Sequence, residues 1–161
     1  MSGRSEFVCD GLYVGGYQGG VAAIDVHEGQ FLWAPDFSSY TGVTVDSKSL
    51  YSSDERSHVW AMDRFSGATL WKQEKLQARN VTRPVLFGDY LVVGDADGYL
   101  HVMSKFDGRF VARVSVGGHE DRFLSENGIL VPPVVTNDMI LVTTRDGMLY
   151  SYTLNDLAVA E

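Results

Sequence analysis

Residues 91–98, which read LVVGDADG, determine the predicted fold, because the chain contains three further copies of this segment. The copies are LYVGGYQG at 12–19, LYSSDERS at 50–57 and ILVTTRDG at 140–147. In each copy an apolar, β-rich run leads to a turn residue seven positions later, which is typical of a β-hairpin. Glycine supplies the positive φ that such turns require, and serine is the weaker substitute in the second copy. The predicted hairpin turns are at Gln18-Gly19, Arg56-Ser57, Asp97-Gly98 and Asp146-Gly147.

The similarity continues after each hairpin. The first two copies read Ala-x-Asp-x-x-x-Gly-x-x-x-Trp, and the third keeps the glycine. The aspartate can accept hydrogen bonds from the backbone of the next turn, the glycine closes that turn, and the tryptophan begins another strand. We expect both tryptophans to be largely buried at equivalent positions. The residues of this signature are Asp25, Gly29 and Trp33, then Asp63, Gly67 and Trp71, then Gly108.

A period of about 40 residues with four short strands in each unit predicts an all-β chain of β-propeller blades. About four blades are present, with repeats at about 7–40, 41–80, 81–116 and 129–161. Residues 1–6 resemble vector-encoded sequence, so the first blade is expected to begin at Phe7 with little of its inner strand. The last repeat has no clear fourth strand after Leu154. Tandem sandwiches are the alternative, but they do not explain a regular repeat.

The third strand of each predicted blade is apolar on both faces. In the third copy Leu100 and Val102 alternate with Tyr99, His101 and Met103. This pattern indicates a sheet that is packed between two neighbouring sheets, with no face toward water.

The composition excludes several classes of protein. The chain has 161 residues, 13 Lys+Arg and 21 Asp+Glu, which gives a formal net charge of −8. An acidic balance argues against nucleic acid as the main partner, because phosphate binding requires clustered lysine and arginine. No apolar run approaches the roughly 20 residues that span a bilayer, and residues 1–6 do not look like a signal peptide. Cys9 is the only cysteine, so an internal disulfide is impossible.

No catalytic, metal or cofactor site is predicted. The four histidines lie in different repeats without metal-ligand spacing, and His58 and His101 are expected to be packed and hydrogen-bonded. Asp95 and Asp97 could form a carboxylate pair, but their position in a tight turn favours local hydrogen bonds. No nucleophile elbow or phosphate-binding loop is present. The chain is therefore predicted to be a binding scaffold and not an enzyme.

Longer stretches resemble one family. The signature is similar to the repeats of pyrroloquinoline-quinone enzymes and their non-enzymatic relatives. The runs VGDADGYLH at 93–101 and DGRFVA at 107–112 are more specific and resemble the C-terminal half of the BamB family, the lipoprotein subunit of the outer-membrane β-barrel assembly machinery. Ser57 and Ala112 depart from the repeat signature, and the connection at 117–128 is longer than the family pattern.

The resemblance implies an eight-bladed ring, of which this chain would supply half, at the periplasmic face of the bacterial outer membrane. It implies a lipid anchor that this chain lacks, no cofactor, and binding to the POTRA domains of the barrel-assembling subunit BamA. Nascent outer-membrane proteins are a further candidate partner. The family's best-known contact segments would lie upstream of Met1.

The long connections between blades are the predicted partner-binding surface, because binding residues commonly lie in long loops on a rigid scaffold. These connections are 36–42, 76–83 and 117–132. Charge reversal at Arg79 or Arg83 is expected to weaken POTRA binding without lowering the melting temperature. The candidate partner-binding residues are Leu76, Arg79, Asn80, Arg83, Asp36, Tyr40 and Arg122.

Two other functions are left open: a fragment of a quinone-dependent dehydrogenase, and a propeller sensor domain with a different partner. A dehydrogenase would need a calcium site and, usually, a disulfide between neighbouring cysteines, which one cysteine cannot form. Both ends of a four-blade chain would expose apolar faces, so we also expect self-association, with two copies completing one ring.

Overall fold

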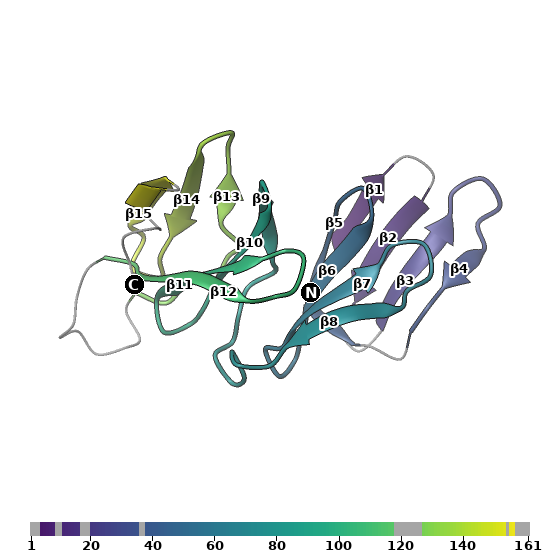
Figure 1. Cartoon of the computed structure of the whole chain (residues 1–161), viewed down its shortest axis with the longest axis horizontal. Helices are drawn as coiled ribbons and strands as arrows, with labels where there is room; N and C mark the ends of the chain where they lie inside the picture. Colours follow the sequence, from purple (N-terminus) through teal and green to yellow (C-terminus); the bar gives the residue numbers. More distant parts are fainter. Residues whose placement is uncertain are drawn as a thin grey trace. The chain divides into compact units, whose positions relative to one another are not determined.

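The computed structural model describes residues 4–8, 11–16, 20–35, 38–117, 127–153 and 155–156, with the backbone alone at 4–8 and at Tyr40. Within these residues the chain forms four antiparallel sheets and no helix long and apolar enough to cross a membrane. The chain divides into two compact units, Met1–Ala78 and Arg79–Glu161, and each unit contains two sheets (Figure 1). The prediction of an all-β chain is confirmed.

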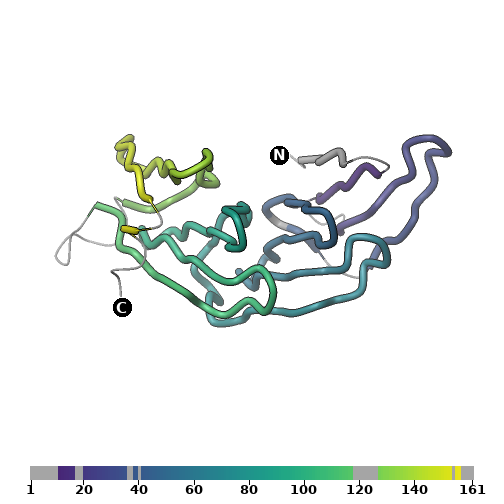
Figure 2. Tube along the Cα trace, turned by 45° about the horizontal axis from the view of Figure 1, so that its top comes forward, coloured from purple at the N-terminus to yellow at the C-terminus, as the bar shows by residue number. Residues whose placement is uncertain are grey.

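The first unit holds two four-stranded sheets. Each sheet is an up-and-down meander in which neighbouring strands also follow one another in the sequence. The path of the chain through residues 41–73 of the second sheet can be followed in Figure 2. Between the two sheets lies a core of buried apolar side chains that includes Tyr13, Val43, Leu50 and Met62. The strands of the first sheet are β1 (Arg4–Val8), β2 (Gly11–Gly16), β3 (Gly20–Asp25) and β4 (Phe31–Trp33). Those of the second are β5 (Ser39–Val45), β6 (Ser49–Asp54), β7 (Val59–Asp63) and β8 (Thr69–Gln73).

The first blade begins earlier than expected. Strand β1 starts at Arg4 and pairs with β2 along its whole length, from Arg4 opposite Gly15 to Val8 opposite Gly11. The expectation that the blade begins at Phe7 with little of its inner strand is therefore wrong. Residues 4–8 read RSEFV, and this short polar segment becomes a strand because the edge of β2 supplies its backbone partners.

The second unit holds one four-stranded and one three-stranded sheet. A second apolar core, with Val92, Leu100, Ile129 and Ile140 fully buried, includes side chains from both sheets. Among the described residues the last sheet has no fourth strand. The strands are β9 (Val85–Phe87), β10 (Tyr90–Gly94), β11 (Tyr99–Ser104) and β12 (Phe110–Ser115), then β13 (Val134–Val135), β14 (Met139–Thr143) and β15 (Leu149–Thr153).

The hairpin turns between second and third strands lie where the repeat predicts them. They join β6 to β7, β10 to β11 and β14 to β15, and their left-handed residues are Ser57 (φ 69°), Gly98 (φ 86°) and Gly147 (φ 85°). The fourth predicted turn, Gln18-Gly19, lies outside the described residues. Ser57 shows that the left-handed conformation belongs to the turn position itself, because a non-glycine residue also adopts it there.

Strand β11 is buried on both faces, as the apolar pattern predicts for the third strand of each blade, whereas β15, its counterpart in the last blade, is not: Leu149 is 64% exposed. Leu100, His101, Val102 and Met103 of β11 are successive residues that point to opposite faces, and each is at most 2% exposed.

The turns between third and fourth strands follow the aspartate–glycine signature. The Oδ1 of Asp25 accepts hydrogen bonds from the backbone N–H groups of His27 (2.7 Å) and Glu28 (3.0 Å), and these bonds lower the pKa of its carboxyl group. Asp63 does the same with Phe65 and Ser66, and its pKa is also lowered, chiefly by its bond to the Ser66 side chain. The glycines of the three turns are left-handed: Gly29 (φ 67°), Gly67 (φ 72°) and Gly108 (φ 70°).

The two signature tryptophans occupy equivalent positions but are half-buried, not largely buried as expected. Trp33 lies 6.1 Å from the ring of Tyr13 at 45°, and Trp71 lies 6.3 Å from the ring of Tyr51 at 41°. Both belong to the outermost strand of their sheet, and this position leaves part of each indole exposed to solvent.

Trp33 also packs against the next blade of its unit. Its Nε1 donates to the carbonyl of Arg64 (2.9 Å). A Cβ added to Gly67 would lie only 2.7 Å from Cε3 of the Trp33 ring. The tight contact explains why glycine is needed at position 67 beyond its left-handed φ.

Candidate functional site

The predicted partner-binding residues have different structural roles. Leu76 is only 2% exposed, so the expectation that it contacts a partner directly is wrong. Asn80 is exposed and left-handed (φ 50°), and Arg83 is half-buried. Asp36 and Arg122, and the side chain of Tyr40, lie outside the described residues.

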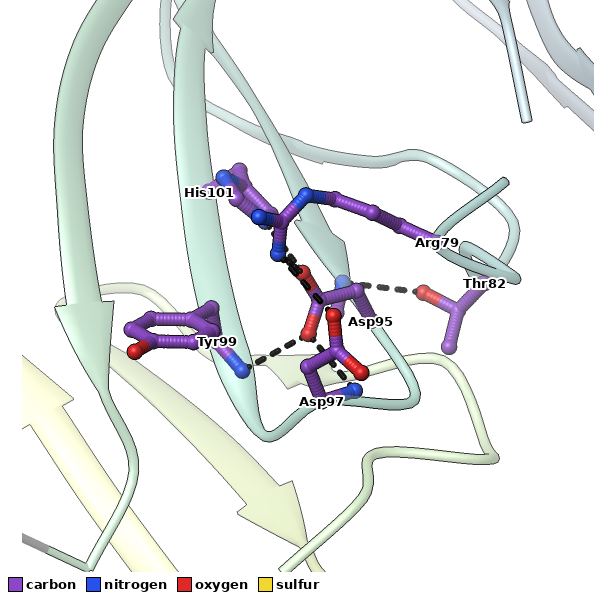
Figure 3. Close-up of polar contacts among 7 residues, drawn as sticks. Arg79, Thr82, Asp95, Asp97, Tyr99 and His101 are labelled. Atoms are coloured by element: carbon purple, nitrogen blue, oxygen red, sulfur yellow. Dashed lines mark hydrogen bonds and ion pairs between the residues drawn. The ribbon is translucent and has the colours of Figure 1, made fainter. Parts of the chain in front are cut away.

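Arg79 enters a polar cluster at the hairpin turn of the third blade (Figure 3). Its Nη1 donates to Oδ2 of Asp95 (2.9 Å) and to Oδ2 of Asp97 (3.2 Å). The guanidinium also lies 5.7 Å from the ring centre of Tyr99, in the range of a cation–π contact. Arg79 therefore pairs with carboxylates of its own chain, whereas the sequence predicted an arginine in a loop that is available to a partner.

Asp95 is the centre of this cluster and is fully buried. Its Oδ1 accepts from the backbone N–H groups of Asp97 (3.0 Å) and Tyr99 (2.8 Å), and its Oδ2 accepts from Nε2 of His101 (2.7 Å) as well as from Arg79. Burial alone would raise the pKa of this carboxyl. The opposing bonds from His101, Tyr99 and Arg79 outweigh burial, and the pKa of Asp95 is lowered.

The local hydrogen bonds predicted for Asp95 are present, as is the packed, bonded state of His101, which is 2% exposed. The aromatic surroundings extend the cluster: the ring of His101 meets Phe110 edge-on at 5.9 Å. Arg113 lies 3.8 Å from the ring centre of Tyr99. What the sequence reasoning missed is the ion pair with Arg79.

This ion pair is part of a wider attachment of the segment 79–83 to the third blade. The carbonyl of Arg79 accepts from the N–H of Ala96 (3.0 Å). Thr82 bonds Gly94 twice: its N–H donates to the Gly94 carbonyl (2.9 Å), and its Oγ1 accepts from the Gly94 N–H (3.1 Å; Figure 3). The segment is therefore fixed at both ends, and the exposed Asn80 lies between the attached residues.

The second blade has an equivalent cluster around Asp54 with different side chains. Its Oδ1 accepts from the N–H groups of Arg56 (2.9 Å) and His58 (2.8 Å). Its Oδ2 accepts from Nδ1 of His58 (2.9 Å) and Nε1 of Trp60 (3.0 Å). The predicted packed state of His58 is thus present, with the ring 4 residues from its carboxylate partner in the chain.

Beside Asp54 the surface has an open pocket of about 250 Å³, within the first unit. Ser38, Arg56, Trp60 and Lys72 are among its lining residues. The clusters and the pocket bring charged and aromatic side chains together at these turns. Among the described residues no three histidine, cysteine or acidic side chains come together as a metal site.

The sequence matches the family described as "Outer membrane protein assembly factor BamB" over residues 3–73 and 61–160. The protein of that name in Yersinia pestis is 40% identical over 147 residues, which is 91% of this chain and 35% of the relative. The protein of that name in Pseudomonas aeruginosa is 37% identical over 145 residues, 90% of this chain and 36% of the relative. The chain thus spans about a third of the length of these relatives.

Solved structures agree with this match. The crystal structure of BamB from Moraxella catarrhalis superimposes with a TM-score of 0.81 at 26% identity, covering 94% of this chain and 43% of that one. The quinohemoprotein alcohol dehydrogenase of Comamonas testosteroni has a TM-score of 0.75 at 14% identity, covering 96% of this chain and 33% of that one, so it shares the fold alone. With the four meander sheets, these similarities confirm the β-propeller fold class.

Proposed function

Because the chain belongs to the BamB family of outer-membrane protein assembly factors, we propose that it is a non-enzymatic scaffold of the outer-membrane β-barrel assembly machinery. It would act at the periplasmic face of the outer membrane and bind the POTRA domains of the barrel-assembling subunit BamA. In this role it helps outer-membrane proteins to insert, and nascent chains of those proteins are a second class of partner. A scaffold needs a shaped surface and no reacting group.

The observation that carries this proposal is the attachment of segment 79–83 to the third blade. Hydrogen bonds from Ala96 and with Gly94, and the ion pair between Arg79 and Asp95, hold the segment in one conformation. A partner that binds a loop already held in place avoids part of the cost of ordering it. The exposed Asn80 is the side chain that this fixed segment presents to solvent.

The quinone dehydrogenase alternative has weaker support. The dehydrogenases with this fold are 14% identical, a level that shows shared architecture and not shared chemistry. The named relatives at 37–40% identity are assembly factors.

Binding of the purified POTRA domains of BamA to the immobilised full chain, measured by biolayer interferometry, tests the proposal. Asn80→Gly should weaken binding by about three- to tenfold. It removes the exposed side chain and keeps a residue that tolerates the left-handed φ, so the loop should remain folded.

Asn137→Gly is the matched control, because Asn137 is also an exposed turn asparagine but lies in the β13–β14 turn. The control should bind as tightly as the parent chain. Failure of the parent chain to bind POTRA domains would refute the proposal that BamA is the partner. Equal binding by the two variants would remove the 79–83 segment from the contact surface.

A further inference from the structure

The open pocket of the second blade is the counterpart of the filled cluster in the third blade. Ser38 and Arg79 both lie nineteen residues before the left-handed residue of their hairpin turn, Ser57 or Gly98. In the third blade the long side chain of Arg79 reaches the turn carboxylates. In the second blade the short Ser38 lines a pocket of about 250 Å³ instead.

A cation would not be bound in this pocket as Arg79 is bound in the third blade. The carboxylate of Asp54 already accepts four hydrogen bonds, two at each oxygen, and His58 supplies the bond to Oδ2 that Arg79 supplies to Asp95. Four bonds fill the acceptor capacity of a carboxylate. The second carboxylate that binds Arg79 in the third blade, Asp97, is replaced by a cation in the second blade, because Arg56 occupies the equivalent position.

Arg56 is an uncommitted cation of the pocket, which the acidic Glu55 also lines. Within the part of the chain that the structure describes, its guanidinium forms no hydrogen bond or ion pair, whereas its backbone N–H and C=O bond Asp54 and Ala78. A guanidinium offers five donors in a planar fork that matches a carboxylate, so an exposed and unpaired one beside a cavity is suited to an anionic group.

Lys72 adds a second cation and Trp60 an apolar wall. The Nζ of Lys72 lies 4.7 Å from the ring centre of Trp60. The lysine also pairs with Glu74, whose side chain is 60% exposed. An exposed pair of this kind contributes roughly 0–1 kcal/mol, so a carboxylate from another molecule can replace Glu74 at little cost.

We propose that this pocket binds an acidic side chain, aspartate or glutamate, of a protein partner. The carboxylate would be held between Arg56 and Lys72, and the methylene groups would lie against Trp60. This inference concerns other residues than segment 79–83 and does not rest on the identity of the partner, because its test uses a small acidic probe.

The test is a titration of the full, ¹⁵N-labelled chain with the dipeptide acetyl-Leu-Glu-amide, monitored at the indole N–H of Trp60 by NMR. We expect a saturable shift with a dissociation constant of roughly 1–10 mM, typical of a single anchoring side chain. Acetyl-Leu-Arg-amide is the matched probe of opposite charge and should bind at least tenfold more weakly. A tighter response to the basic dipeptide, or no response of Trp60 to the acidic one, would overturn the proposal.

Variants of the pocket test the roles of its charges. Arg56→Ala should weaken the acidic probe about tenfold, and Glu55→Gln should strengthen it about two- to threefold, because Glu55 lines the same pocket. Arg145→Ala, which changes an exposed arginine in the hairpin turn of another blade, should have no effect. Unchanged affinity in Arg56→Ala would contradict the inference.

A double variant provides a test in the opposite direction. Ser38→Arg with Arg56→Asp installs in the second blade the arginine and aspartate of the third. The new side chain should fill the pocket and abolish binding of the acidic probe, with urea unfolding still cooperative. Retained binding in this variant would show that the probe lies elsewhere.

Discussion

Replacing Arg79 by methionine should destabilise the chain, contrary to the sequence-based expectation that charge changes there leave the melting temperature unchanged. Methionine keeps an unbranched side chain of similar reach but removes the charge and the donors. Asp95 is fully buried and would lose one of its four hydrogen bonds, the one from Nη1 at 2.9 Å.

The magnitude follows from what remains at Asp95. Removing one partner of a fully buried ion pair costs roughly 3–5 kcal/mol. Here the loss is smaller, because the Arg79 side chain is 29% exposed and the carboxylate keeps its bonds from Asp97, Tyr99 and His101. We expect a loss of about 2 kcal/mol, near that of one hydrogen bond to a charged group. For a chain of this size the melting temperature would fall by about 4–8 °C.

Urea unfolding at pH 7 measures the loss, and acid unfolding gives a second readout. The folded-state pKa of Asp95 lies below its unfolded value, so its ionised form contributes stability that is complete above about pH 4 and is lost as the pH falls through the folded-state pKa. Without Arg79 that pKa rises, and acid unfolding should begin at a higher pH.

The control is Arg109→Met, which removes an arginine that is 82% exposed and paired with Asp107 at 2.9 Å. Its loss should be below about 0.5 kcal/mol. If Arg79→Met and Arg109→Met unfold at the same urea concentration, the buried ion pair does not stabilise the third blade, and the reasoning is refuted.

Four further substitutions test the repeat geometry by urea unfolding. Gly94→Ala should cost about 1–3 kcal/mol, because its Cβ would lie 2.4 Å from Cγ2 of buried Ile129; a neutral effect would mean that this contact relaxes freely. Ser57→Gly should stabilise by about 0.5 kcal/mol, because glycine adopts φ 69° without strain, and a loss of stability would contradict this account. Trp33→Ala and Trp71→Ala should each cost about 3 kcal/mol, the low end for a buried tryptophan because both are half-buried, and a loss below about 1 kcal/mol in either would contradict the packing of its indole against the neighbouring tyrosine.

The turns were predictable from the sequence because their chemistry is local. Asp25 and Asp63 bond N–H groups two and three residues ahead, and Gly98 and Gly147 adopt the left-handed conformation at the predicted positions. Each of these features depends on residue type and spacing within one turn. The number and order of the strands follow from such turns when a sheet is a meander.

The polar clusters were not predictable in the same way. Arg79 is 16 residues from Asp95 in the chain, and whether its side chain reaches the turn depends on the path of the intervening loop and on β9 and β10. Strand β1 was missed at its N-terminal end for a similar reason, because only its pairing with β2 identifies Arg4 as part of a strand. The periodicity of apolar residues reports local secondary structure and does not identify which residues distant in the sequence will pair.

A position-by-position comparison of the repeats would have found the Arg79 contact. The turn carboxylate is present in the second and third blades as Asp54 and Asp95, and the residue nineteen positions before the turn differs, Ser38 in one and Arg79 in the other. A carboxylate at a buried turn needs hydrogen-bond donors, so the residues around it must change together. In the third blade the loop supplies Arg79, which donates to Oδ2 of Asp95. In the second blade the loop supplies Ser38, and His58 donates the corresponding bond to Oδ2 of Asp54. Residues that repeat therefore maintain the blade, whereas residues that differ around a repeated charge determine which blade has an open pocket.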